Sequence, residues 1–106
     1  MPLLEKKCIP CEGGTSPLKE DEIKTFLKEI PLWEIKNGHV FRQFKFKNFK
    51  ESIAFVNKVA EIAENEGHHP DITINYNKVS IEIWTHAING LSENDFILAA
   101  KIDKIK

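Results

Sequence analysis

The sequence predicts an α+β domain in which three helices lie on one face of a four-stranded antiparallel sheet. Two observations predict the strands: an Asn-Gly pair at 37–38 between short apolar segments, and alternating apolar residues over 72–83. Asn-Gly is the strongest short-range signal for a hairpin, which pairs antiparallel strands. Three stretches with apolar residues at every third or fourth position predict the helices. The expected element order is therefore α-β-β-α-β-β-α.

The first helix and the first hairpin are expected before residue 47. Ser16-Pro17 is typical of a helix start, because the hydroxyl can cap the helix and proline is tolerated in its first turn. Pro31 should end this helix. Strands are expected over Trp33 to Lys36 and Val40 to Phe46, on the two sides of the Asn-Gly turn.

A long helix should follow, with Asn48 as its N-cap and Gly67 as its C-cap. One buried stripe at helical spacing is expected to contain Phe49, Ile53, Val56, Ala60 and Ala63. Three further apolar residues, Phe55, Val59 and Ile62, widen this stripe. Because this surface is wider than one sheet face requires, a second contact surface on the helix is expected.

The second hairpin and the last helix complete the domain. Two alternating sets predict its strands, Ile72, Ile74 and Tyr76, then Val79, Ile81 and Ile83. The turn between them is expected near Asn77-Lys78. Ser92 to Asp95 resembles a capping box with Asp in place of the usual Glu, and it should open a helix that continues through Ile102.

Length and charge limit the classes of function. A chain of 106 residues forms a single domain, 1–106, and residues 1–15 are expected to be an N-terminal extension of it. With 15 Lys and Arg against 16 Asp and Glu, the net charge of −1 provides no electrostatic footprint for nucleic acid. No apolar run approaches the roughly 20 residues that span a bilayer, and the N-terminus has no apolar segment of signal-peptide length. A soluble cytoplasmic protein that binds neither nucleic acid nor a membrane is expected.

The two cysteines form a Cys-x-x-Cys motif, Cys8-Ile9-Pro10-Cys11. Such a motif can be half of a zinc site or a redox pair. Half a zinc site needs two more ligands at regular spacing, and a redox pair should open a helix, whereas a Glu-Gly-Gly loop signal follows here. A structural or incidental role is therefore favoured, and a redox role is the next alternative.

Three of the four histidines point to acid/base chemistry, because imidazole is the side chain best suited to move protons near neutral pH. His68 and His69 should lie in the link between the long helix and the third strand, where Pro70 makes the chain extended. His86 should follow the fourth strand. The start of one strand of a hairpin and the end of the other lie at the same edge of the sheet. The three imidazoles can therefore converge.

Two carboxylates are expected near the same edge. Glu64 should lie in the last turn of the long helix and Asp95 in the first turn of the last helix. Either could orient an imidazole or accept hydrogen bonds from a ligand. Simpler alternatives stay open: Glu64 as a solvated residue, Asp95 as a cap only, and the histidines as residues satisfied by backbone groups. A zinc site is a further alternative, although adjacent histidines on one loop are awkward joint ligands. His39 follows a hairpin turn, has no partner in sequence, and is expected to be exposed.

Four linked motifs resemble the pterin-4a-carbinolamine dehydratase family. They are Glu64-x-x-x-His68-His69-Pro70, Tyr76-Asn77-Lys78-Val79, Thr85-His86 and Gly90-Leu91-Ser92-Glu93-x-Asp95. The similarity runs from about Leu18 to the C-terminus. The linked set is highly specific, whereas His-His-Pro alone would not be.

The resemblance implies that the protein dehydrates 4a-hydroxytetrahydropterin to quinonoid dihydropterin, the step that recycles tetrahydrobiopterin beside an aromatic amino acid hydroxylase. It implies no cofactor and no metal. His69 matches the principal acid/base histidine of the family, and His68 and His86 match the other two catalytic histidines. The substrate-binding or supporting positions are Glu64, Pro70, Thr85 and Asp95.

The family also provides an alternative function and an assembly. Vertebrate members bind and stabilise the dimer of a transcription factor through helix surfaces, so a non-enzymatic protein partner of the long helix is the alternative. Members form dimers across the sheet and often tetramers through helices. The resemblance therefore implies a homodimer or homotetramer.

Overall fold

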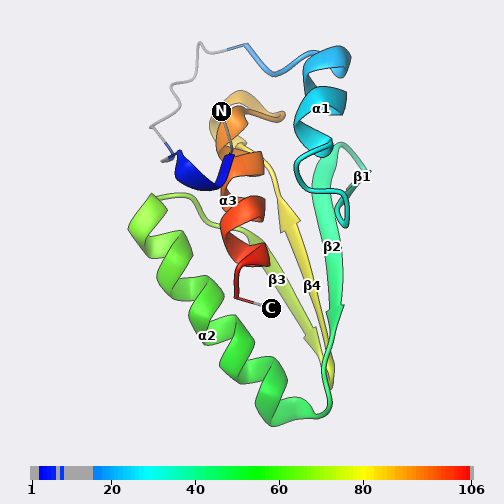
Figure 1. Cartoon of the computed structure of the whole chain (residues 1–106), viewed down its shortest axis with the longest axis vertical. Coiled ribbons are helices and arrows are strands. Elements are labelled where there is room, and N and C mark those ends of the chain that lie inside the picture. The colour runs from blue at the N-terminus through cyan, green and yellow to red at the C-terminus, as the bar shows by residue number, and fades with distance from the viewer. Residues whose placement is uncertain (1–2, 7, 9–15, 106) are drawn as a thin grey trace.

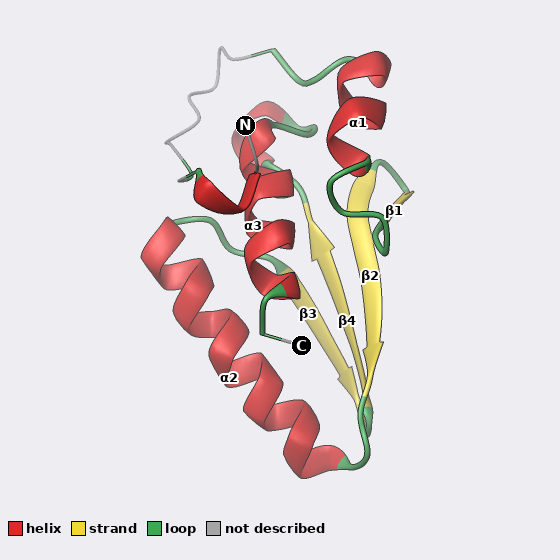
Figure 2. Cartoon of the chain, viewed as in Figure 1, coloured by secondary structure: helices red, strands yellow, loops and turns green. Residues whose placement is uncertain are grey.

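The computed structural model describes residues 3–6, 8 and 16–105, and its elements follow the predicted order (Figures 1 and 2). The helices are α1 (Glu20–Leu27), α2 (Phe49–Glu66) and α3 (Glu93–Asp103), and the strands are β1 (Glu34–Lys36), β2 (His39–Lys45), β3 (Asp71–Asn75) and β4 (Lys78–Ile83). Two short 3-10 helices, η1 (Leu3–Glu5) and η2 (His86–Ile88), precede α1 and α3. The predicted α+β fold is therefore confirmed.

The sheet has the order β1-β2-β4-β3, with every neighbouring pair antiparallel. The central pair β2 and β4 is the longest, and Val40 of β2 lies opposite Ile83 of β4. Helices α2 and α3 lie over one face of this sheet (Figure 1). Because β3 begins where β4 ends, the links that precede β3 and follow β4 meet at one edge of the sheet.

Both hairpin turns use backbone in the left-handed region. Asn37 and Gly38 have φ of 54° and 79°, which matches the expected Asn-Gly turn. In the second hairpin the turn comprises Tyr76 and Asn77, one residue earlier than predicted, and Tyr76 has φ of 53°. Asn77 is held at this turn because its carbonyl accepts the Phe46 N–H at 2.7 Å and its side chain donates to the Phe46 carbonyl. Tyr76 therefore lies outside the strand, with its side chain exposed.

Local sequence signals predicted both ends of α2 but not the start of α1. As predicted, the Asn48 side chain accepts the Glu51 N–H at 2.9 Å, and Gly67 ends α2 with φ of 65°. Helix α1, however, begins at Glu20 and not at Ser16-Pro17. The reason is a tertiary contact, in which the Leu18 N–H donates to the Leu91 carbonyl at 2.8 Å and keeps this segment outside the helix.

The apolar surface of α2 is divided between two rows. The row that faces the sheet contains Ser52, Phe55, Val59 and Ala63. The predicted stripe was wrong in this respect, because Phe49 is 50% exposed and Ala60 is also exposed. Periodicity identified both rows, but either could have faced the sheet. The outward row contains Phe49 and Ala60, which are exposed, and Ile53 and Val56, which are partly buried, and the second contact surface expected from the width of the stripe would lie on this row.

The core lies between the sheet and the helices. Its fully buried members include Val40, Phe44, Val59, Val79, Ile81, Ile83, Phe96, Leu98 and Ile102. Arg42 is a polar residue among the inward side chains of β2, and it is satisfied by Asp103 of α3, at 2.6 Å from Oδ1. Trp33 donates to the same oxygen at 2.8 Å. This carboxylate therefore holds the C-terminal end of α3 against the sheet.

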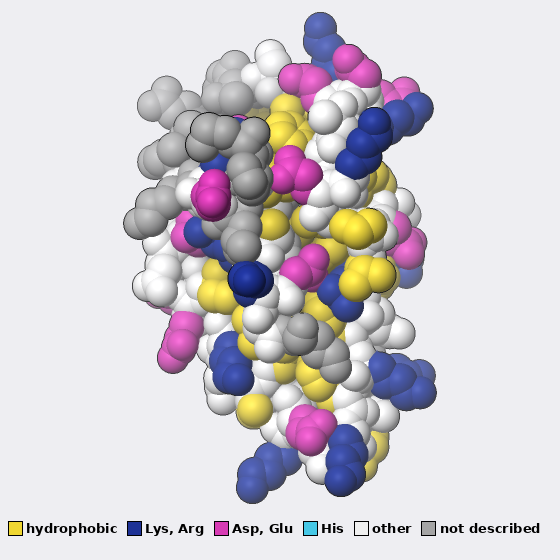
Figure 3. Space-filling model, viewed as in Figure 1, with side chains coloured by type: hydrophobic (Ala, Val, Ile, Leu, Met, Phe, Trp, Pro, Cys, Tyr) yellow, Lys and Arg dark blue, Asp and Glu magenta, His cyan; other side chains and the backbone are white. Residues whose placement is uncertain are grey.

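Charged side chains of both signs are interspersed over the face seen in Figure 3. Such a surface lacks the concentrated basic patch typical of nucleic-acid binding. Within the described ranges, no helix is long and apolar enough to cross a membrane.

The two rows of α2 predict opposite effects for the same substitution. Val59 is fully buried, so Val59→Glu places a carboxylate in the core and should lower the free energy of unfolding by about 3 kcal/mol or more. Phe49→Glu introduces the same residue at a half-exposed position and should cost less than about 1 kcal/mol. Urea denaturation followed by circular dichroism measures both. Equal losses of stability would contradict the assignment of the two rows.

Candidate functional site

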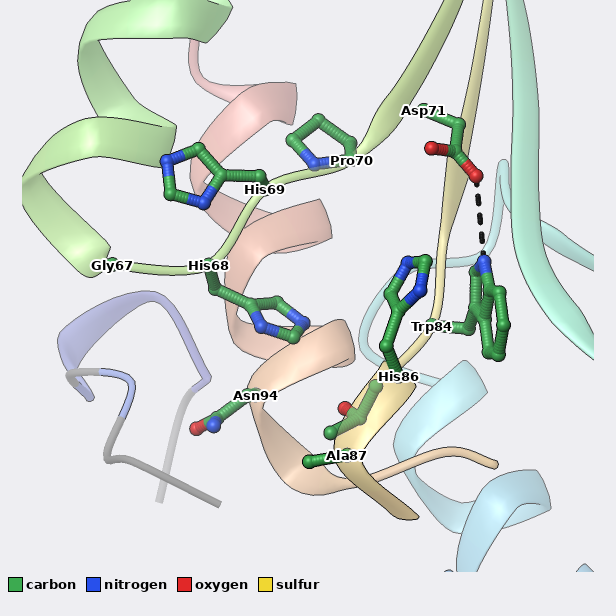
Figure 4. A pocket seen from close by; sticks show the side chains of 10 residues that line it. Gly67, His68, His69, Pro70, Asp71, Trp84, His86, Ala87 and Asn94 are labelled. Atoms are coloured by element: carbon green, nitrogen blue, oxygen red, sulfur yellow. Dashed lines mark hydrogen bonds between the residues drawn. The ribbon is translucent and has the colours of Figure 1, made fainter. Parts of the chain in front are cut away.

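An open pocket lies at the sheet edge where α2 ends, β3 begins and β4 ends (Figure 4). Its lining residues are Gly67, His68, His69, Pro70, Asp71, Trp84, Thr85, His86, Ala87 and Asn94. Its volume of about 470 Å³ is within the range of small-molecule sites, about 300–1,000 Å³. All three histidines selected from the sequence line this pocket, together with Pro70 and Thr85. Glu64 and Asp95 are not in its lining.

His68 is held by a buried carboxylate. Its Nε2 lies 2.6 Å from Oδ1 of Asp95, whose side chain is fully buried. Against a carboxylate, this nitrogen carries the hydrogen, which leaves Nδ1 as the nitrogen with a lone pair in the neutral ring. The contact fixes both the tautomer and the direction of the ring. In Figure 4 the His68 ring extends toward the side of the pocket where His86 lies, and the His86 ring lies against Trp84.

Asp95 receives hydrogen bonds from three elements. Besides His68, the Thr85 hydroxyl lies 3.1 and 3.0 Å from its two oxygens, and the Ser92 N–H donates at 2.8 Å. The predicted capping box of α3 is thus formed. A buried carboxylate is costly unless donors surround it, and these three provide that compensation. Asp95 therefore acts as a cap and as the support of His68 at the same time.

His69 is paired with Glu64 on α2. Its Nε2 lies 2.5 Å from Oε2 of Glu64, and the His69 side chain is 61% exposed. Figure 4 shows its ring turned toward α2 and not toward His86. The pair is possible because Gly67 ends the helix and the chain reverses within five residues. Among the predicted residues, His69 with Glu64 is the pair most open to water.

His86 lies in a short loop that closes on itself. The Thr85 N–H donates to the Gly90 carbonyl at 2.9 Å, and Gly90 returns a bond to Thr85. Between them η2 makes one turn, and Asn89 adopts a left-handed conformation with φ of 49°. Thr85 therefore fixes the base of this loop while its hydroxyl binds Asp95. This backbone arrangement holds His86 at the pocket mouth.

Sequence reasoning missed an aromatic cluster beside the site. The Trp84 ring stacks on His86 with centroids 3.9 Å apart, and on His39 with centroids 4.5 Å apart. The expectation that His39 is exposed and without a partner was wrong, because it is half-buried and its Nδ1 is also paired with the Glu82 carboxylate. The strand register gives the reason: Val40 lies opposite Ile83, so the preceding His39 lies beside Trp84. Alternation continued past Ile83 could have indicated that Trp84 faces away from the core.

Cys8 lies near the site but is a poor nucleophile. Burial and the neighbouring Glu66 carboxylate raise the pKa of its thiol to about 12. The thiol therefore stays protonated near neutral pH, and reactive cysteines require the thiolate. Its Sγ lies 3.5 Å from the Asn94 carbonyl, consistent with a structural role. Cys11 lies outside the described residues.

The described side chains contain no group of three or more His, Cys, Asp or Glu that is arranged to hold a metal ion. The carboxylates nearest to the imidazoles are instead used as hydrogen-bond partners, Asp95 for His68 and Glu64 for His69. The pocket is lined by three imidazoles, and each is oriented by a neighbouring side chain. Such a set suits proton transfer to and from a bound molecule.

Comparison with known proteins agrees with this chemistry. A family model described as pterin 4 alpha carbinolamine dehydratase matches residues 16–105. A candidate pterin-4-alpha-carbinolamine dehydratase of Alkaliphilus metalliredigens is 52% identical over 104 residues, which covers 96% of this chain and 94% of that protein. A protein of Rickettsia canadensis with the same name is 53% identical over 103 residues, covering 95% and 94%.

Solved structures extend the likeness to the fold. A crystal structure described as a transcriptional coactivator/pterin dehydratase from Brucella melitensis has a TM-score of 0.80 and 33% identity, covering 85% of this chain and 98% of that one. A pterin dehydratase-like protein described as a RuBisCO assembly factor in the alpha-carboxysome has a TM-score of 0.57 and 26% identity, covering 69% and 84%. With its sequence, its fold and its histidine pocket in agreement, the chain belongs to the pterin-4a-carbinolamine dehydratase family.

Proposed function

We propose that the protein dehydrates 4a-hydroxytetrahydropterin to quinonoid dihydropterin by histidine general acid/base catalysis. One observation carries the proposal: three imidazoles line one pocket, and each is held by another side chain of the fold. In the reaction the C4a–O bond breaks, and the leaving hydroxyl takes a proton and departs as water. The N5 proton is lost as the N5=C4a double bond forms. The reaction therefore needs one proton donor and one acceptor, with no change of redox state.

His69 is the proposed principal acid/base. The Glu64 carboxylate holds Nε2, so Nδ1 is the nitrogen that exchanges a proton with the substrate. Because both side chains are largely exposed, water can restore the proton between turnovers. A carboxylate that orients the ring also stabilises the imidazolium formed during transfer. Glu64 thus acts through His69 in this proposal.

His68 and His86 are the proposed catalytic partners. Asp95, which is itself held by the Thr85 hydroxyl, holds His68 so that the His68 Nδ1 can accept a hydrogen bond or a proton from the pterin. His86 completes the other side of the pocket. Pro70 contributes an apolar wall and keeps the chain extended after His69. The family match begins at residue 16, so we place residues 1–15 outside the catalytic unit of a single domain.

The physiological role that fits is recycling of tetrahydrobiopterin beside an aromatic amino acid hydroxylase. Biopterin, folate-like and molybdopterin-related compounds share the bicyclic ring that this pocket would bind. The test is a stopped-flow assay of 4a-hydroxytetrahydropterin decay with and without the protein, repeated with different side chains at C6. Decay at the uncatalysed rate with every pterin would refute the proposal.

A second candidate is a non-enzymatic role as a binding partner of another protein. It is favoured by the Brucella relative, which is described as a transcriptional coactivator as well as a pterin dehydratase. The outward apolar row of α2 would be the surface involved, and Phe49 is an exposed member of it. A purely binding protein would have no need of the supported histidines. Loss of turnover on substitution of His69, with any partner binding retained, separates the two roles.

Among the alanine variants of the three histidines, His69→Ala should cause the largest loss of dehydration rate. Positioned acid/base catalysis contributes about 10²–10⁴-fold, so the dehydration rate should fall by a factor in that range. The domain should remain folded, because His69 is largely exposed. His68→Ala or His86→Ala should each cost less, since another imidazole or water can partly substitute. Stopped-flow rates and circular dichroism of the three variants test this order, and wild-type turnover by folded His69→Ala would contradict it.

Removal of metal should leave the rate unchanged. The proposed step transfers protons to and from the pterin and uses no Lewis acid or metal-bound hydroxide. The protein should therefore keep its rate after dialysis against a strong chelator, and elemental analysis should find no stoichiometric zinc. A rate that is lost on chelation and restored by zinc would assign the histidines to a metal site.

We also propose a homodimer or homotetramer with two-fold symmetry in which α2 contributes one interface. Its outward row of Phe49, Ile53, Val56 and Ala60 would be covered there. Light scattering at micromolar concentration should find a mass of two or four chains, and Phe49→Glu should reduce that mass while each subunit keeps its pocket. Lys58→Gln, which makes the same change of −1 in net charge at an exposed position of α2, is the matched control. A wild-type monomer would exclude this assembly.

A further inference from the structure

The three site imidazoles are held in two different ways. His68 and His69 each bind a carboxylate through Nε2. The His86 side chain makes no hydrogen bond with any residue that the structure describes, and its only recorded ring contact is with Trp84, at an interplanar angle of 29°. Among the described side chains, the stack on Trp84 is therefore the contact that orients the His86 ring. Trp84 thus supports His86 as Asp95 supports His68 and Glu64 supports His69.

Trp84 is fixed on its other face and at its edge. The His39 ring covers the second face at an interplanar angle of 10°, nearly parallel. The indole N–H donates to Oδ2 of Asp71 at 3.4 Å, and His39 is in turn paired through Nδ1 with Glu82. Because an imidazole occupies each face of the indole, Trp84 cannot also stack on a flat ligand. The role left to the Trp84 ring is to support His86.

The stack is anchored on the central strands of the sheet. His39 begins β2 and Trp84 follows the last residue of β4, and these are the two central strands. Their pairing extends from Val40–Ile83 to Lys45–Lys78, so the stack stands on the longest ladder of the sheet. His86 itself lies in a loop that is exposed to solvent. The stack thus connects an exposed loop residue to the two central strands of the sheet.

We infer that Trp84 and His39 are positioning residues for His86, with the His39–Glu82 pair and Asp71 fixing the indole. The inference rests on the proposed dehydration and extends it to residues outside the pocket, since His39 and Glu82 do not line it. An aromatic face also attracts an imidazolium, so the support holds in both protonation states of His86. Displacement of a catalytic group by about 1 Å can lower a rate by orders of magnitude. The stack therefore bears on turnover more than on substrate binding.

His39 provides the cleanest kinetic test because it does not touch the pocket. His39→Ala should lower kcat about three- to tenfold and change KM less than about twofold, since the interaction lost is one that orients a catalytic group. His39→Phe keeps a ring against Trp84 and should restore most of kcat. Trp84→Leu should lower kcat at least as much as His39→Ala, and Trp84→Phe should recover part of it. Phe41→Leu, on a neighbouring residue of β2 outside the stack, is the matched control and should leave kcat unchanged.

A spectroscopic measurement tests the stack independently of activity. An imidazole stacked on an indole has its carbon-bound protons shifted upfield by the ring current. The His86 signals in a ¹H–¹³C spectrum, assigned with His86→Gln, should show this shift in the wild type. They should lose it in Trp84→Leu, move partly in His39→Ala and return in His39→Phe. Signals that stay unchanged in folded Trp84→Leu would overturn the inference.

The two measurements separate this inference from the proposed function. If the wild type dehydrates the pterin and His39→Ala keeps the wild-type kcat, the inference fails and the proposed function stands. If the wild type has no dehydratase activity, the proposed function fails and the role of the stack in turnover fails with it, while the spectra still report whether it orients His86. A fall of kcat in His39→Ala that His39→Phe does not restore would show that a ring stacked on Trp84 is not what turnover requires, which would also overturn the inference.

Discussion

The burial of one carboxylate, that of Asp95, is the constraint on which the site depends. A fully buried carboxylate must be surrounded by donors, and here they come from the α2–β3 link, the end of β4 and the start of α3. His68, Thr85 and the Ser92 N–H are those donors. Satisfying Asp95 therefore brings three segments to one point. The same contacts that stabilise the fold also set the direction of the His68 ring.

The supports of the three imidazoles differ in burial, and this difference suits different tasks. His68 rests on a buried carboxylate, His69 on an exposed one, and His86 on an aromatic ring. A buried partner fixes geometry, whereas an exposed partner leaves a ring accessible to water for proton exchange. The scaffold thus places three similar side chains in three different environments.

The sheet and the helices contribute separately to this arrangement. The antiparallel pairing of β3 with β4 brings the links that contain His69 and His86 to one edge of the sheet. This placement follows from strand pairing and does not depend on the helices. Helix α2 determines the position of His68 and His69, because it ends at Gly67, which adopts a left-handed conformation, and the two histidines follow directly. Its two apolar rows then serve different surfaces, one the core and one the outside. A single helix thereby positions two residues of the site and presents an outward apolar row.

The sequence alone determined the element order, the Asn37-Gly38 hairpin, the caps of α2 and the histidines of the pocket, because these depend on local backbone preference and on spacing along the chain. Tertiary structure alone decided three other features. It selected the row of α2 that faces the sheet, started α1 after the contact between Leu18 and Leu91, and paired His39 with Trp84. Each depends on residues far apart in sequence, and a pattern along one chain does not specify which of several compatible partners meets it in space.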